Sequence, residues 1–146
     1  MIGIVLIAHN HIAGEMLAAA EHVLGKQSLI STLDVGASDR PDLVQDELAG
    51  LIRQNDTGDG VFILADMFGG TPCNIAISCA SPGRVEVLSG FNLPSLIKSL
   101  SLRQQTRDVL ALAKDVVAAG QQYMCLASEY MLRQNDSGGA EAREGV

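Results

Sequence analysis

The sequence contains no tryptophan, and aromatic residues make up only 3% of its 146 positions. Basic residues are also few: 10 Lys and Arg stand against 17 Asp and Glu, and the net charge is −7. This deficit of positive charge excludes the basic surface expected of a nucleic-acid-binding protein. It also argues against adsorption to an anionic membrane surface. Because 47% of the residues are hydrophobic, we expect a globular chain with a mainly aliphatic core.

Long apolar runs are absent too. None approaches the roughly 20 residues that a membrane-spanning helix needs, so we expect no membrane insertion. The three cysteines, Cys73, Cys79 and Cys125, match no zinc or redox spacing, and no signal peptide precedes them. A cytoplasmic, reducing location is therefore expected. Cys73 lies near an expected helix start, where it is either a reactive thiol or a small packing residue.

Strand-like and helix-like segments alternate along the chain. Aliphatic runs predict buried strands at 2–8, 29–35, 61–65 and 84–88. Helical spacing predicts helices at 11–24, 41–54, 71–80, 92–102 and 106–119, with Gly25 and Gly120 as stops. The alternation favours an open, doubly wound α/β fold, whose mainly parallel four-stranded sheet carries helices on both faces. Residues 1–133 are expected to form one domain and 134–146 a disordered tail, while 121–127 fit either a further strand or a continued helix.

Two expected strands are followed directly by residues that can do chemistry. The run 2–8 leads into His9, and the run 61–65 leads into Asp66. Ligands of parallel α/β sheets bind beyond the carboxyl ends of the strands, so the two side chains could meet in one crevice. A neutral imidazole is a competent nucleophile near neutral pH. A carboxylate that accepts its other N–H fixes the tautomer and stabilises the developing charge, which makes Asp66 the candidate partner of His9.

Gly69, Gly70 and Thr71 follow the aspartate and open an expected helix that has Pro72 in its first turn. Backbone N–H groups at a helix N-terminus bind anions, and glycine lets the backbone come close to a ligand. The Thr71 hydroxyl adds a further donor. Each feature alone also fits a cap, a turn or a surface residue. Their joint placement favours a site that holds a phosphoryl group on the histidine.

A metal site is a second hypothesis for the same region. His9 and His11 would converge on a metal ion only if the backbone between them is extended, and Asp66 would be the third ligand. The corresponding function would be a small metal-dependent hydrolase. Nucleotide-binding and zinc-protease motifs and the Gly-x-Ser-x-Gly elbow are missing from the sequence, and the leading hypothesis requires no cofactor and no metal.

The chain resembles the mannose-family enzyme IIA domain of the bacterial phosphoenolpyruvate-dependent sugar phosphotransferase system. The resemblance covers residues 1 to about 128 and rests on three blocks: VLIAH at 5–9 with Ala13 and Leu17, DMFGGTPCN at 66–74, and GFNLPSL at 90–96. The middle block is the most specific. Phosphotransfer subunits of dihydroxyacetone kinases share the fold and the histidine, but they lack the Gly-Gly-Thr-Pro pattern after the aspartate.

The resemblance implies a phosphotransferase in which His9 accepts a phosphoryl group from the phosphocarrier HPr and passes it to a IIB component. It implies that Asp66 bonds the imidazole and that the backbone of Gly70 and Thr71 contacts the phosphoryl group. It also implies a homodimer that exchanges a C-terminal antiparallel strand, here 121–127. The family usually has Gly after the active histidine, where this chain has Asn10, a residue that tolerates unusual backbone angles. Since no IIB-like region is seen, the alternative is a regulatory phosphorelay module whose phospho-state controls a protein partner rather than sugar uptake.

Overall fold

The central strands consist of aliphatic residues that are shielded from water on both faces. The computed structural model describes residues 1–136, and strand β1 (Gly3–His9) is buried from end to end except at His9. It lies between β2 (Ile30–Val35) and β3 (Val61–Ala65), and β4 (Val85–Ser89) completes the sheet. All four strands run parallel in the order β2-β1-β3-β4. The predicted α/β fold with a parallel four-stranded sheet is confirmed.

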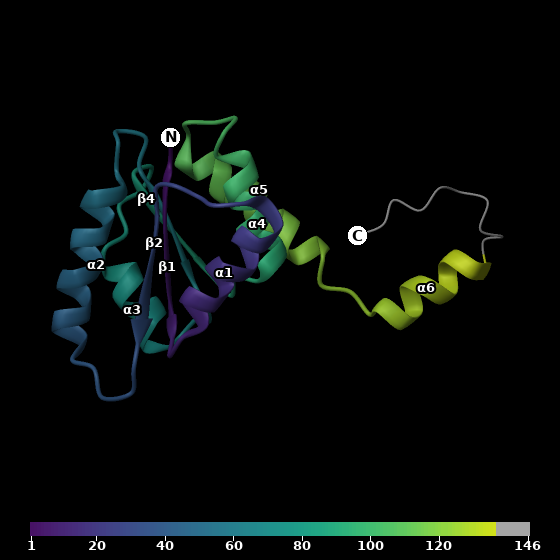
Figure 1. Cartoon of the computed structure of the whole chain (residues 1–146), viewed down its shortest axis with the longest axis horizontal. Helices are drawn as coiled ribbons and strands as arrows, with labels where there is room; N and C mark the ends of the chain where they lie inside the picture. Colours follow the sequence, from purple (N-terminus) through teal and green to yellow (C-terminus); the bar gives the residue numbers. More distant parts are fainter. Residues whose placement is uncertain (137–146) are drawn as a thin grey trace.

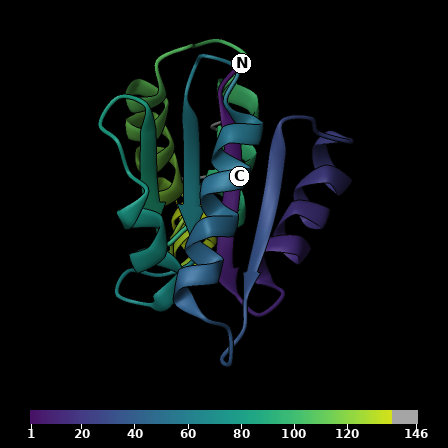
Figure 2. The same cartoon turned by 90° about the vertical axis from the view of Figure 1, so that its left-hand side faces the viewer.

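Helices cover both faces of this sheet, as Figures 1 and 2 show. On one face lie α1 (Ile12–Leu24), α4 (Leu93–Leu102) and α5 (Val109–Gln122); on the other lie α2 (Pro41–Asn55) and α3 (Thr71–Ser78). Alternate residues of β1 supply the two cores. Each fully buried aliphatic side chain contributes about 1.5–3 kcal/mol to the stability of the folded state. The sheet is therefore a firm support for the residues at its strand ends.

Strand order creates a switch point beside β1. The chain passes from β1 through α1 to β2 on one side, and then returns through α2 to β3 on the other side. The crossovers therefore diverge at the carboxyl ends of β1 and β3. In open parallel sheets this is where ligands bind. His9 ends β1 and Asp66 directly follows β3, so the topology brings both to this point.

Two expectations concern the end of α5, and the first of them is wrong. Gly120 does not stop the helix, which continues to Gln122. A Cβ on Gly120 would lie 3.2 Å from the Ser95 Cβ, so glycine serves here to let α5 approach α4 closely. Residues 121–127 form no strand: they hold the end of α5, a turn and the first residue of α6 (Ala127–Asp136). An exchanged strand would need the sheet edge of a second chain, and a single chain offers it no pairing partner.

Helix α6 projects away from the body of the molecule (Figure 1). It includes residues 134–136, so the expected disordered tail does not begin at 134; the rest of that tail, 137–146, lies outside the described residues. Within residues 1–136, no helix combines the length and the apolar character that crossing a membrane requires.

Candidate active site

His9 and Asp66 form a close pair at the switch point. The His9 Nδ1 lies 2.7 Å from the Asp66 Oδ2, and the His9 backbone N–H donates to the same oxygen at 3.0 Å. The Asp66 side chain is 13% exposed, whereas the His9 side chain is 43% exposed. The carboxylate is thus held inside the sheet edge, and the imidazole reaches past it toward solvent.

The charge state of Asp66 suits this pairing. Burial raises the pKa of the carboxyl, but hydrogen bonds from the backbone and ring of His9 lower it more, and the net pKa lies below its ordinary value. The Met67 backbone N–H adds a bond to Oδ1 at 3.0 Å. An ionised carboxylate only accepts hydrogen bonds, so Nδ1 of His9 must carry the proton. In the neutral imidazole the other ring nitrogen, Nε2, then has its lone pair free.

Gly70 packs against the imidazole of His9. A Cβ on Gly70 would lie 2.9 Å from the His9 Cε1 and 3.4 Å from Nε2, so a larger residue would displace the ring. Gly69 has a φ of +87° and open space around the position of a Cβ. Glycine is therefore needed there for the backbone turn before α3, and not for a close contact with the imidazole. Gly70 is also the N-cap of α3 and has no capping side chain. No side chain therefore caps the first N–H groups of α3. This uncapped helix start begins at Gly70, next to the imidazole.

A cleft of about 380 Å³ opens beside the histidine. His9, Asn10 and Thr71 line it together with residues from the end of β2 to the start of α2: Val35, Gly36, Ala37, Asp39 and Pro41. The Asp39 Oδ2 accepts the Gly36 N–H at 2.7 Å, which fixes this loop. The N-terminus of α2, like that of α3, has no capping side chain. Asp39 was not among the residues predicted for the site; only its position after a strand end could have indicated it.

Asn10 takes the left-handed backbone conformation, with a φ of +49°. Its N–H donates to the Val35 carbonyl at 3.0 Å, which anchors the turn after His9 to β2. Glycine adopts this conformation freely and asparagine does so more readily than most other residues. The departure from the usual glycine is therefore accommodated by the backbone.

His11 belongs to a different pair. Its Nδ1 lies 3.1 Å from the Asp34 Oδ2, and its side chain is 87% exposed. The structure therefore does not unite His9, His11 and Asp66 as the metal hypothesis requires. Among residues 1–136 no group of three or more His, Cys, Asp or Glu side chains could hold a metal ion.

Cys73, in the first turn of α3, is buried, with 1% of its surface exposed. Burial raises the pKa of its thiol, and the negative charge of Asp66 raises it further. The thiolate is the reactive form of cysteine. Of the two roles expected for Cys73, the environment favours packing.

Comparison with known proteins agrees with the resemblance seen in the sequence. The family model EIIA-man, described as "PTS system fructose IIA component", matches residues 3–117. The mannose-specific EIIAB component of Escherichia coli K12 is 30% identical over 103 residues, which are 70% of this chain and 32% of that protein. The chain thus spans about a third of the length of that relative.

Two further relatives match most of their own length. The fructose-specific EIIA component of Bacillus subtilis is 25% identical over 134 residues, 90% of each chain. The solved mannose/sorbose-specific IIA subunit from Enterococcus faecalis has a TM-score of 0.74 and 26% identity, covering 86% of this chain and 93% of that one. The chain belongs to the mannose-type EIIA family of the phosphotransferase system.

Proposed function

We propose that this chain is a phosphohistidine carrier of the sugar phosphotransferase system. It accepts a phosphoryl group from phospho-HPr on His9 and passes it to a IIB component. The main support is the 2.7 Å contact between the His9 Nδ1 and the Asp66 Oδ2, which leaves Nε2 free beside Gly70. The family membership gives independent support for a phosphotransferase component.

The proposed step balances without a metal or a cofactor. The lone pair of the His9 Nε2 attacks phosphorus, and the P–N bond of the donor phosphohistidine breaks. The donor ring, which carries a proton on its other nitrogen, leaves as a neutral imidazole with the electron pair of that bond. The Nδ1–H of His9 stays in place, so the phosphorylated ring is an imidazolium whose positive charge faces Asp66.

Positioning supplies most of the catalysis in this proposal, because phosphoryl transfer passes through a loose transition state with little covalent work for the protein. Asp66 holds the ring in one orientation. The uncapped start of α3, at Gly70 and Thr71, provides backbone donors and a favourable dipole for the phosphoryl oxygens. Gly69 allows the turn that places them.

The proposed assembly is a homodimer in the cytoplasm that meets HPr and a IIB component in turn. The C-terminal segment after α5 exposes several large apolar side chains: Met124, Leu126, Met131 and Leu132. Exposed apolar surface of this kind marks contact sites for other chains. A second copy of the chain is the partner that we propose for this segment.

A phosphorylation assay tests the proposed function. The protein is incubated with phosphoenolpyruvate, enzyme I and HPr, and its intact mass and the acid lability of the product are read. We expect one acid-labile phosphoryl group on the wild type and none on His9→Ala. His11→Ala is the matched control, because it removes a neighbouring exposed imidazole, and it should be phosphorylated like the wild type.

Full phosphorylation of His9→Ala would overturn the assignment of the nucleophile. A wild type that stays unmodified, with a donor shown to be active on a known IIA, would overturn the function. Adding IIB components then separates the two versions of the role. Loss of the phosphoryl group to a IIB supports transport. A protein that binds only one phospho-state, with no transfer to any IIB, supports the regulatory alternative.

A further inference from the structure

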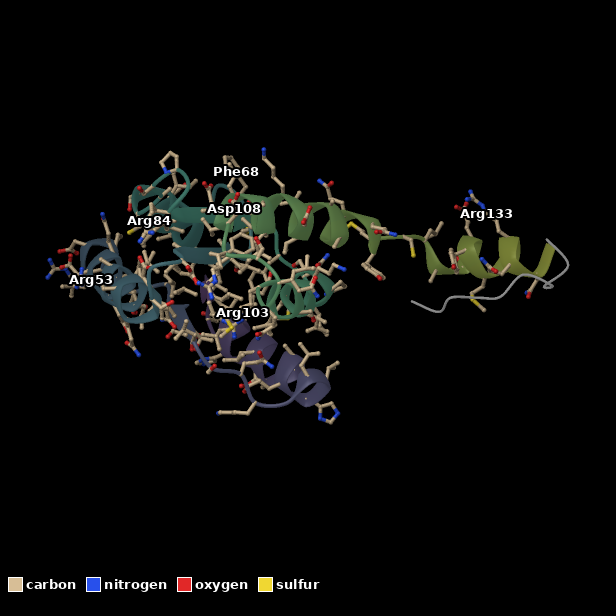
Figure 3. All side chains as sticks on the ribbon, turned by 90° about the horizontal axis from the view of Figure 1, so that it is seen from above. Arg53, Phe68, Arg84, Arg103, Asp108 and Arg133 are labelled. Carbon is tan, nitrogen blue, oxygen red and sulfur yellow. The ribbon has the colours of Figure 1, made fainter. Side chains whose placement is uncertain are left out.

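A polar cavity lies at the end of the sheet opposite to His9, where the strands begin. It has a volume of about 320 Å³, at the lower end of the range of about 300–1,000 Å³ found for pockets that hold small molecules. Figure 1 shows the N-terminus at this end of the molecule, and Figure 3 looks onto it from above with Arg103 and Asp108 labelled. The cavity is lined by the first residue and by the loop that joins α4 to α5: Met1, Arg103, Gln104, Gln105, Thr106 and Arg107.

Arg103 forms part of the floor of this cavity. Its side chain is 1% exposed, and its two terminal nitrogens donate to backbone carbonyls just before β1 and β2. Its third donor, the Nε–H, is buried and has no hydrogen-bond partner within residues 1–136. A buried donor without an acceptor costs about 1–3 kcal/mol, and more when the group is charged. Such a donor calls for an acceptor that the chain itself does not supply.

The lining is positively charged although the chain as a whole is acidic. Two guanidiniums and no carboxylate line the cavity, on a chain with a net charge of −7. The exposed Arg107 makes no hydrogen bond or ion pair within the described part of the chain, and it attracts Asp59 only at longer range. Asp59 already contacts the Met1 amino group at 2.6 Å, and Asp108 caps the start of α5. Both neighbouring carboxylates therefore have donors, and the Arg107 guanidinium is available to a ligand.

The α4–α5 loop adds further donors from other directions. The backbone N–H groups of Thr106 and Arg107 donate to no acceptor within residues 1–136, and the amides of Gln104 and Gln105 are exposed. A phosphate monoester has three acceptor oxygens and nearly two negative charges, so it can use donors that converge from several sides. A carboxylate has two oxygens in one plane and a single charge. Amide side chains both donate to and accept from hydroxyl groups.

We propose that this cavity binds a phosphate group, carried by a small hydroxylated molecule such as a sugar phosphate or present as the free ion. The phosphate accepts the Arg103 Nε–H at the floor and pairs with the Arg107 guanidinium at the rim. The site is distinct from the candidate active site, because Arg103 bonds the carbonyl of Ile2 before β1, whereas His9 ends that strand. It does not depend on the proposed phosphocarrier role.

Titration of the unphosphorylated full chain tests this site. The probes are glucose 6-phosphate, inorganic phosphate, glucose and malonate, at constant ionic strength in a phosphate-free buffer. Calorimetry gives the Kd, and heteronuclear NMR follows the Arg103 Nε–H and the backbone amides. The variant is Arg107→Gln, which removes the exposed guanidinium and leaves Arg103 in place. The matched control is Arg53→Gln, an exposed arginine in the last turn of α2 on the other face of the sheet, well away from Arg103 in Figure 3.

We expect glucose 6-phosphate to bind the wild type with a Kd of about 1 mM or tighter, and to shift the Arg103 Nε–H signal and the amides of Thr106 and Arg107. Arg107→Gln should weaken binding at least about tenfold, because a charge-assisted hydrogen bond is lost. Arg53→Gln should leave the Kd within about twofold of wild type, because a distant exposed charge is screened. Glucose and malonate should cause no shift at the same concentration.

The two sources of the phosphate group are told apart by their affinities. Tighter binding of glucose 6-phosphate than of inorganic phosphate supports a sugar phosphate as the ligand, and the reverse order supports the free ion. Malonate that binds as tightly as either would refute the choice of phosphate. Shifts confined to Gly70 and Thr71 would place the anion at the histidine and refute this site. Equal affinities of Arg107→Gln and Arg53→Gln, or an unchanged Arg103 Nε–H signal at saturation, would refute it as well.

Discussion

A single oxygen of Asp66 holds His9 at two points. Oδ2 accepts the backbone N–H of His9 at 3.0 Å and contacts the ring Nδ1 at 2.7 Å. The first bond fixes where β1 ends, and the second fixes how the imidazole is turned. Because both partners are rigid strand ends, the orientation of the free Nε2 is set before any ligand arrives.

Replacing Asp66 should damage the chemistry far more than the fold. In Asp66→Asn the amide can still accept the His9 backbone N–H, but it carries no charge to stabilise an imidazolium. We expect the rate of phosphorylation by phospho-HPr to fall at least about 100-fold. Stopped-flow or quenched-flow kinetics measure this, with circular dichroism as the check on folding. A variant within about threefold of wild type would mean that Asp66 does not orient the nucleophile.

Gly70→Ala should slow phosphorylation because the new methyl group would sit 2.9 Å from the His9 Cε1 and displace the ring. We expect a loss of at least about tenfold in rate. Gly14→Ala is the matched control: it lies in α1 with nothing within 4 Å of the added Cβ. That change should leave the rate unaltered and stabilise the fold by about 0.5–1 kcal/mol. Equal rates for the two variants would contradict the close contact.

Asn10 should tolerate glycine and reject a β-branched residue, because its φ is +49°. We expect Asn10→Gly to stay within about 0.5 kcal/mol of the wild-type free energy of unfolding, and Asn10→Val to lose about 1–2 kcal/mol. Urea denaturation of the three proteins measures both values. A fully stable Asn10→Val would show that the turn after His9 can relax into another conformation.

Stability should fall in acid partly through Asp66. Its pKa in the folded protein is lowered by the hydrogen bonds from His9, which outweigh the effect of burial. A group with a depressed folded-state pKa contributes stability above its unfolded pKa of about 4, and this contribution is lost as pH falls through the folded value. Urea titrations from about pH 6 to about pH 3 should therefore show a steeper decline in the wild type than in Asp66→Asn. Parallel curves would exclude this linkage.

Arg103 should be essential for stability although it lies far from His9. It is 1% exposed, and its guanidinium donates to the carbonyls of Leu29 at 2.9 Å, Ile2 at 3.3 Å and Ser28. Arg103→Met would remove these donors, with only the Leu29 carbonyl keeping another partner, the Ile4 N–H at 3.1 Å, and should cost about 3 kcal/mol. Urea denaturation measures the loss, and phosphoramidate labelling of the folded fraction tests whether the site is spared. A loss below about 1 kcal/mol would show that water replaces the guanidinium.

The sequence by itself predicted the parallel sheet and the two layers of helices, and it placed His9 and Asp66 at the ends of two neighbouring strands. Strands buried on both faces are continuous aliphatic runs, and β3 was placed at Val61–Ala65 from that pattern alone. Its errors lay mainly in α5, which spans Val109–Gln122 rather than 106–119, and in the segment after it. Glycine is both a helix stop and a close-packing residue, and only the neighbouring Ser95 shows which role Gly120 has.

Tertiary structure alone decided which residues meet. His9 and His11 are only two residues apart in the sequence. The fold nevertheless pairs His9 with Asp66 and His11 with Asp34. The distance between Gly70 and the imidazole, the cleft beside Asp39 and the exposure of Phe68 likewise depend on how separate strand ends are brought together. Local sequence fixes where each strand ends, because burial and turn chemistry are local. Pairing between strands is a property of the whole sheet, since it depends on contacts between residues far apart in the chain.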